Sequence, residues 1–224
     1  MHVARSSDAA DWIVPRLHPF AADVGSFIPE GFEAYARILH PPLKRASDGR
    51  IIGVRWQEIA AANDRSVEEE VLLVDESGDP TQLGPSGEAM WDEQSHVGSL
   101  SPDIAERLIH TLSSHTETPA QCWYAVWEGW GDVRNRWRTA PTLSIPGREM
   151  LLFEGTIGDA LFTFAGVDWS YRSANLWWPD DRSWFVSTEI DFKWTYVGGS
   201  RECIAQLLSD PLLEVFLVTP TTIR

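Results

Sequence analysis

The chain of 224 residues has few cysteines, few cations and no long apolar run. Its two cysteines, Cys122 and Cys203, are too few for a disulfide framework, and both are expected to be small buried hydrophobes in a reducing compartment. A disulfide between the two stays open. No apolar stretch reaches the length of a membrane span and no signal peptide is visible at the N-terminus, so a soluble cytoplasmic protein is expected.

Cations are outnumbered, since 18 Lys and Arg residues stand against 33 Asp and Glu, which gives a net charge of −15. This balance argues against nucleic acid and anionic membranes as partners, because both require concentrated positive charge. The acidity serves solubility, or it provides an acidic face for a basic partner.

Motifs for metal, phosphate and nucleophilic chemistry are also missing. There is no C-x-x-C or H-E-x-x-H, and the six histidines are scattered, so no metal is expected. No P-loop, dinucleotide fingerprint or G-x-S-x-G is present, and no cofactor is predicted. Gly198 and Gly199 before Ser200 have the form of an anion site at a helix start, but they also fit an ordinary strand-to-helix turn.

Tryptophan, in contrast, is abundant. Twelve are present, and nine of them fall between Trp123 and Trp194, mostly in CWYAVWEGWG (122–131) and NLWWPDDRSWF (175–185). Such a density indicates either an aromatic core or a surface built to hold something flat.

The hydrophobic pattern predicts strands interleaved with helices. Ser101 and Ser200 are expected to cap helices at 101–115 and 198–211, and shorter helices are expected at 55–64 and 156–164. Strands are predicted at 121–129, 149–155, 183–191 and 212–220, and at 31–42, where a helix face also fits. Several strands follow one another directly, which favours an α+β fold with a mixed or mostly antiparallel sheet and helices packed on it.

Residues 75–100 are rich in Gly, Pro, Ser and acidic residues and are predicted to form a long polar loop. We expect a single domain over residues 1–224. The alternative is a small N-terminal part over 1–75 and a main domain over 101–224. Residues 1–25 are expected to form an irregular or loosely docked arm.

The segment WWPDDRSW has the clearest local logic. Pro179-Asp180-Asp181 predicts a turn, and Arg182 can pair with a neighbouring Asp or stack on a Trp. Adjacent tryptophans point to opposite sides of a strand, so one of Trp177 and Trp178 is expected to cover a loop or face solvent. The alternative is that both cap the end of the core.

Three functions follow from these patterns. The first is a non-catalytic binding or protein-interaction module, antitoxin-like or regulatory, for a protein or a small molecule; its Trp-rich face would comprise Trp130, Trp177, Trp178, Arg182, Glu128 and Asp181. The second is a hydrolase of a carbohydrate or another ring-bearing molecule that uses Glu128, Glu189 or Asp191 as paired carboxylates. The third places the functional face in the N-terminal half, near His18 to His40, with all tryptophans structural.

The strings HPFAADVGSFIPEGFEAYARILHP, CWYAVWEGWG and NLWWPDDRSWFVSTEIDFKWTYVGGS resemble motifs of a family of uncharacterised actinobacterial cytosolic proteins. The resemblance covers most of the chain outside residues 75–100. Because no activity is assigned to that family, it implies no role for any residue. A looser likeness to small α+β immunity proteins of bacterial toxin systems rests on composition and layout.

Overall fold

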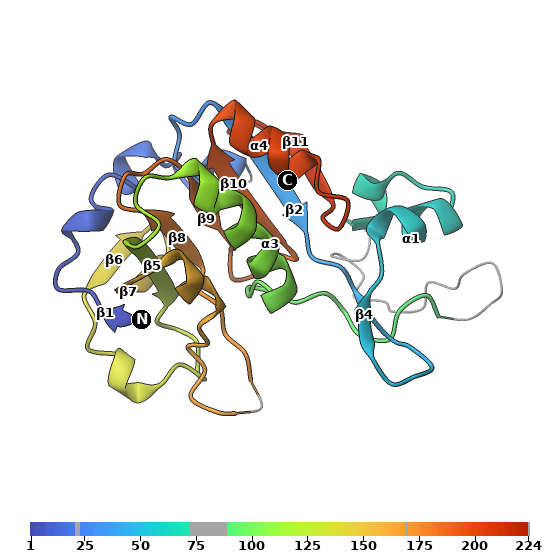
Figure 1. Cartoon of the computed structure of the whole chain (residues 1–224), viewed down its shortest axis with the longest axis horizontal. Helices are drawn as coiled ribbons and strands as arrows, with labels where there is room; N and C mark the ends of the chain where they lie inside the picture. The colour runs from blue at the N-terminus through green and yellow to red at the C-terminus, as the bar shows by residue number, and fades with distance from the viewer. Residues whose placement is uncertain (21–22, 72–88, 169, 224) are drawn as a thin grey trace.

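The computed structural model describes residues 1–20, 23–71, 89–168 and 170–223 of the chain. One long antiparallel sheet runs through this part, with helices in front of it and a small lobe at one side (Figure 1). The strands are β1 (His2–Val3), β2 (Ala34–Leu39), β3 (Leu43–Arg45), β4 (Ile51–Gly53), β5 (Cys122–Trp127), β6 (Thr142–Ile145), β7 (Arg148–Gly155), β8 (Leu176–Pro179), β9 (Phe185–Ser187), β10 (Trp194–Gly199) and β11 (Val215–Val218). The α-helices are α1 (Trp56–Ala62), α3 (Pro102–Leu112) and α4 (Arg201–Leu208), and residues 67–71 are also helical. The 3-10 helices are η1 (Asp8–Ala10), η2 (Val14–Arg16), η3 (Val24–Ser26), η4 (Ser113–His115), η5 (Asn135–Trp137) and η6 (Ile157–Leu161).

The strand order of the main sheet is β1-β7-β5-β8-β9-β10-β2-β11, with β6 also paired to β7. Every pairing is antiparallel, which confirms the predicted mostly antiparallel α+β fold, although the sheet dominates more than expected. β2 lies between β10 and β11, so strands from both sides of residues 75–100 share one sheet. A division of the chain into residues 1–75 and 101–224 would place strands of this one sheet in two different parts. Residues 72–88 of the predicted loop lie outside the described residues.

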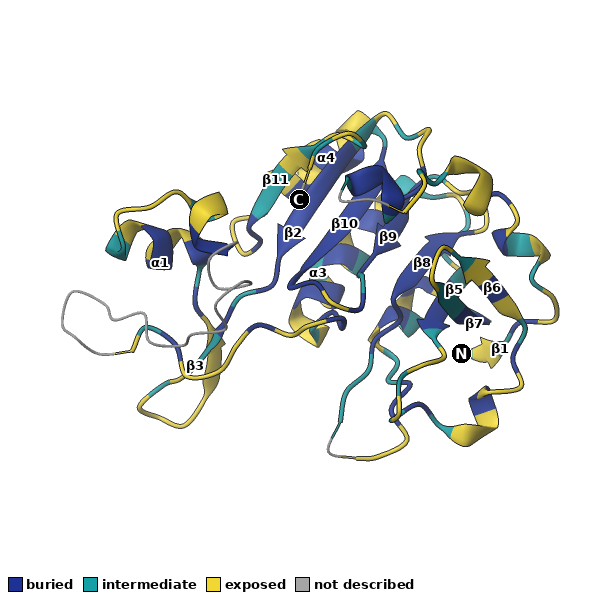
Figure 2. Ribbon diagram, turned by 180° about the vertical axis from the view of Figure 1, so that it is seen from behind, coloured by how far each residue is buried: buried dark blue, intermediate teal, exposed yellow. Residues whose placement is uncertain are grey.

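Both faces of the sheet are covered. Helices α3 and α4 lie on one face, where Ile104, Leu108 and Leu207 join a buried cluster with Trp177 and Trp184. The N-terminal arm covers the other face and forms a second cluster that includes Trp178. The central strands are therefore buried along most of their length, as the view from behind shows (Figure 2).

The N-terminal arm is irregular, as predicted, but the expectation that it docks loosely is wrong. It contains three short 3-10 helices; Ala10 and Ile13 are completely buried, and Val24 is 1% exposed. The backbone N–H groups of Val24 and Gly25 donate to carbonyls of Thr222 and Pro220 near the C-terminus. Apolar burial and these hydrogen bonds fix a segment that has no helical or strand periodicity.

Local signals placed two helices correctly. The Ser101 hydroxyl accepts a hydrogen bond from the Ile104 N–H and caps α3, and Ser200 does the same for Cys203 in α4. The helix expected at 156–164 is shorter and of 3-10 type, closed by a capping box between Thr156 and Asp159. Among the described residues, no helix combines the length and the apolar character needed to span a membrane.

A lobe made of β3, β4 and α1 lies at one side of the sheet (Figure 1), and Trp56 and Ile59 of α1 belong to the same buried cluster as sheet residues such as Trp194. The Glu214 carboxylate attaches it by accepting hydrogen bonds from the Trp56 and Gln57 N–H groups at the start of α1. The Trp56 indole N–H also donates to the His40 carbonyl. A cleft of about 570 Å³ separates the lobe from α3 and is lined by both charged and apolar side chains, such as Arg107 and Leu212.

Candidate functional site

The end of β5 holds two tryptophans that are only half-buried, Trp127 and Trp130. Their rings meet edge to face at 5.2 Å between centroids, with an interplanar angle of 78°. Gly129 lies between them, and a Cβ added there would stand 2.2 Å from the Trp127 ring. Glycine is therefore required at this turn because the indole packs directly on the backbone.

Asn175 fixes the position of both tryptophans. Its side-chain oxygen accepts hydrogen bonds from the Trp127 backbone N–H at 3.0 Å and the Trp130 indole N–H at 3.2 Å. Its amide donates to the carbonyls of Gly98 and Thr188. Asn175 is 1% exposed and its oxygen and amide are all engaged, so the Trp130 ring and the Trp127 backbone are held before any partner arrives.

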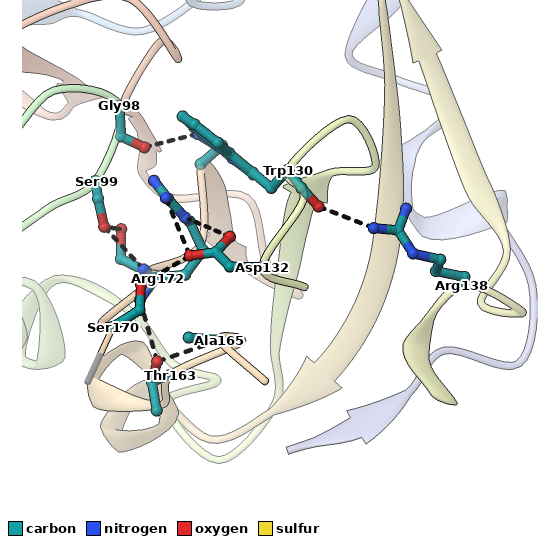
Figure 3. A network of polar contacts seen from close by, with 11 residues as sticks. Gly98, Ser99, Trp130, Asp132, Arg138, Thr163, Ala165, Ser170 and Arg172 are labelled. Atoms are coloured by element: carbon teal, nitrogen blue, oxygen red, sulfur yellow. Dashed lines mark hydrogen bonds and ion pairs between the residues drawn. The ribbon is translucent and has the colours of Figure 1, made fainter. Parts of the chain in front are cut away.

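Arg172 lies on the Trp130 ring, with its guanidinium carbon 3.6 Å from the ring centroid (Figure 3). The same guanidinium forms an ion pair with Asp132 at 3.2 Å, and the Ser170 hydroxyl donates to that carboxylate. Partial burial acts to raise the pKa of Asp132, but the hydrogen bonds from Arg172 and Ser170 outweigh it and lower the pKa from its ordinary value. Asp132 is thus an ionised anchor for Arg172 near neutral pH.

Two further arginines complete the arrangement. The Arg148 guanidinium lies 5.6 Å from the Trp127 ring centroid and forms ion pairs with Glu189 and Asp191. Arg138 donates to the backbone carbonyls of Glu128 and Trp130 from the exposed side of the turn. We call this set of side chains the arginine–tryptophan patch: Trp127, Trp130, Arg138, Arg148 and Arg172.

The chain segment that follows the β5 turn differs in charge from the chain as a whole. Residues 133–148 contain four arginines and no Asp or Glu, in a protein of net charge −15. One of the four, Arg136, is exposed and lies over Trp137 at 4.4 Å. This composition is a sequence signal for Arg138 and Arg148. No local signal marks Arg172 or Asn175, because their partners lie about 40 residues away in the chain.

Trp177 and Trp178, predicted as parts of a binding face, are both buried, at 2% and 0% exposed. Trp177 stacks on Tyr124 on the α3 side, and Trp178 stacks on Phe185 on the opposite side. Of the two alternatives for this pair, the expectation that one of them covers a loop or faces solvent is wrong. Both lie in the core, because the N-terminal arm covers the second face. Neither ring is available to a partner.

The other predicted site residues lie at the surface, with Trp130 half-buried, but they do not converge. Glu128 and Trp130 follow the last residue of β5. Asp181 and Arg182 follow Pro179, the last residue of β8, which pairs with Cys122, the first residue of β5. Five strand steps of about 3.3 Å therefore separate the two groups by roughly 17 Å. Antiparallel pairing of β5 with β8 is the physical reason.

Asp181 and Arg182 have local roles instead. The Asp181 carboxylate accepts hydrogen bonds from the N–H groups of Glu117 and Ser183 and from the Thr116 hydroxyl, which ties the turn to the loop after α3. Its pKa is lowered, since these hydrogen bonds outweigh the burial that acts to raise it. The Arg182 guanidinium lies over Trp12 at 5.5 Å.

Two of the three carboxylates considered for hydrolysis, Glu189 and Asp191, are engaged with arginine. Glu189 and Asp191 both bind Arg148, and Glu189 also accepts a hydrogen bond from the Asp191 N–H. Glu189 lines an apolar cavity between the N-terminal arm and the sheet. The space there that a water molecule can enter is about 30 Å³, room for one or two waters and not for a sugar ring.

The histidines of the third hypothesis are structural in this arrangement. His40 is 1% exposed, and burial lowers its pKa to about 4. His18 binds Asp23 and Glu30, and these hydrogen bonds raise its pKa.

The part of the chain that the structure describes contains no cluster of side chains suited to metal binding and no reactive thiol. No three His, Cys, Asp or Glu side chains there are grouped so that they could hold a metal ion. The two cysteines are free and buried, and burial raises the pKa of each thiol to about 12. They are unreactive core residues at neutral pH, as the sequence suggested.

The chain matches no protein-family model, no curated protein and no solved structure. The resemblance to the actinobacterial family therefore stays a prediction. The class that the described residues define is an α+β protein built on a long antiparallel sheet, with an arginine–tryptophan patch at one strand end.

Proposed function

We propose that this protein is a non-catalytic binding module and that the arginine–tryptophan patch holds an acidic segment of a protein partner. The observation that supports this most directly is the half-exposed Trp130 ring, stacked 3.6 Å from the Arg172 guanidinium and locked by Asn175. Tryptophan and arginine are the residue types that dominate binding energy at protein interfaces.

Preorganisation is the physical advantage of this arrangement. A partner that binds flexible side chains loses about 0.5–1.5 kcal/mol for each one that it immobilises. Asn175, Asp132 and the two backbone carbonyls below Arg138 already hold the patch in one geometry. Little ordering entropy remains to be lost when a partner docks.

Charge selects the kind of partner. Arg138 uses two of its N–H groups on carbonyls, so others remain for a carboxylate, and Arg136 is exposed beside it. Guanidinium groups bind carboxylates with two parallel hydrogen bonds, which favours an acidic partner segment at this location. The net charge of −15 on the whole chain repels acidic partners elsewhere on the surface.

The hydrolase alternative has no observation in its favour. Its carboxylates at Glu189 and Asp191 neutralise Arg148, and the cavity beside Glu189 does not admit a sugar. A binding role needs neither a free carboxylate pair nor a deep cavity.

Intrinsic tryptophan fluorescence tests the proposal, with a 20-residue glutamate homopolymer as the probe. We expect titration at low salt to shift or quench the emission, and we expect the response to weaken at physiological salt because exposed charges are screened. Arg138→Gln should weaken binding several-fold, because it removes an exposed guanidinium without touching the core.

Arg50→Gln is the matched control, since Arg50 is also an exposed arginine and pairs with Asp48 on the lobe. It should leave binding unchanged. Equal losses in the two variants, or no response from the unmodified protein, would contradict the patch as the binding face. Hydrolysis of aryl glycosides that depends on Glu189 would favour the alternative function.

A further inference from the structure

We infer that β11 is an association edge, at which a second copy of this chain adds its own β11 in antiparallel orientation and continues the sheet. β11 is the last strand in the sheet order, and among the described residues it pairs only with β2. The inference concerns a surface separate from the arginine–tryptophan patch and does not depend on the proposed function.

The register shows which backbone groups point outward. The Leu39 N–H donates to the Glu214 carbonyl, so this residue pair is a hydrogen-bonded one. Hydrogen-bonded and non-hydrogen-bonded pairs alternate in an antiparallel ladder. Phe216 and Val218 therefore bond to β2, and the N–H and C=O groups of Val215 and Leu217 point away from it.

The residue types of β11 do not protect this outer strand in the usual way. Its sequence is Val-Phe-Leu-Val, without a charged residue or proline, in a chain with 23% charged residues. Leu217 is 65% exposed. Natural proteins place lysine, proline or a bulge at such positions because an apolar edge pairs readily with another strand.

The strand is also complementary to itself, which identifies a second copy as the occupant. A two-fold axis at Phe216 places Val215 opposite Leu217 of the second copy, and Leu217 opposite its Val215. The outward N–H and C=O groups of these residues then form four hydrogen bonds across the axis. The same operation covers the exposed Leu217 and the partly buried Val215, the two apolar side chains of this face, as an isologous interface requires.

Nearby apolar side chains extend the surface. Leu208 on α4 is 40% exposed, and Leu212 in the turn before β11 is 67% exposed. Repulsion between two molecules of net charge −15 opposes association, and salt screens it over about 8 Å at physiological ionic strength. We therefore expect dimerisation to strengthen as salt is raised, the opposite of the salt effect at the patch.

Sedimentation velocity over a concentration series, at low and high salt, measures this directly. The mass should rise from 25.2 kDa toward twice that value as concentration and salt increase. Leu217→Lys, at an exposed position, should raise the dimer dissociation constant by roughly tenfold or more because it charges the edge. Leu161→Lys, at an exposed leucine on η6, is the control and should leave the constant unchanged.

Leu217→Pro gives a second, backbone-specific test. Proline removes an N–H that points away from β2, so the β2 ladder keeps its hydrogen bonds while the dimer loses two. Hydrogen exchange in the unmodified protein should show amides of Phe216 and Val218 protected at every concentration. Amides of Val215 and Leu217 should gain protection only as the concentration rises.

Two results would overturn the inference. One is a chain that stays monomeric at all concentrations and salts while the Val215 and Leu217 amides exchange freely. The other is a dimer that Leu217→Lys and Leu217→Pro leave intact, which would place the interface elsewhere.

Discussion

The buried imidazole of His40 predicts how stability depends on pH. The ring lies directly after β2 and is 1% exposed. One ring nitrogen lies 2.8 Å from the His96 carbonyl and the other lies 2.9 Å from the Thr195 hydroxyl. The nitrogen at the carbonyl must donate, so the other accepts from Thr195, and the neutral ring satisfies both contacts.

Protonation of this ring is costly in the folded state. Burial lowers the pKa of His40 from 6.5 to about 4. In the unfolded chain the ring titrates normally, so between pH 6.5 and 4 the unfolded state binds the additional proton. The free energy of unfolding therefore falls as the pH falls through this window, by roughly 1 kcal/mol at pH 5.5 and roughly 3 kcal/mol at pH 4.

Urea unfolding of the unmodified protein and of His40→Gln at several pH values isolates this contribution. The variant is less stable at pH 7 because packing is lost, but it has no imidazole to protonate. The difference in unfolding free energy between the two proteins should therefore shrink by ~1 kcal/mol from pH 7 to pH 5.5 and by ~3 kcal/mol to pH 4. Other groups cancel in this difference. A gap that stays constant from pH 7 to pH 4 would refute the reasoning, and so would an NMR titration of His40 centred near pH 6.5.

Two further substitutions test the contacts that hold the molecule together. Asn175→Ala removes the side chain that binds Trp127, Trp130 and the carbonyls of Gly98 and Thr188, so we expect a loss of about 3 kcal/mol or more in urea unfolding and a change in tryptophan emission. A loss below about 1 kcal/mol would mean that water replaces the amide. Glu214→Ala leaves two N–H groups at the start of α1 without their carboxylate and should cost about 2 kcal/mol, whereas Glu214→Gln keeps one acceptor and should cost less. Burial raises the pKa of Glu214, so the charge itself contributes less than the hydrogen bonds, and equal losses in the two variants would contradict this order.

Sequence reasoning succeeded where the determinants are local. Ser101 and Ser200 begin α3 and α4 because each hydroxyl accepts a hydrogen bond from an N–H three residues later. Alternating and all-apolar runs indicated strands, and direct succession of strands indicated antiparallel pairing. Asp181 bonds the backbone of its own turn, as its place after a proline suggested.

The arm that covers the second face of the sheet could not be predicted in this way. Residues 8–28 have no periodicity, yet Ile13 and Ile28 are fully buried. Whether Trp178 is core or surface depends on this arm, which lies more than 150 residues away in the chain. The site has the same limit, because Asn175 and Arg172 reach Trp130 only through tertiary folding.

The distribution of tryptophan burial gives the strongest reason to look for function at β5. Of the described tryptophans, only Trp123, Trp127 and Trp130 are half-buried, and all three lie on β5 or in the turn after it. The partial exposure of Trp123 has a structural explanation, because its indole N–H donates a hydrogen bond to Asp180, directly after the neighbouring strand β8. Packing alone does not explain the other two, since a glycine, an asparagine and three arginines are positioned around rings that remain open to water. The residues that hold Trp127 and Trp130 are therefore those whose substitution should separate binding from stability.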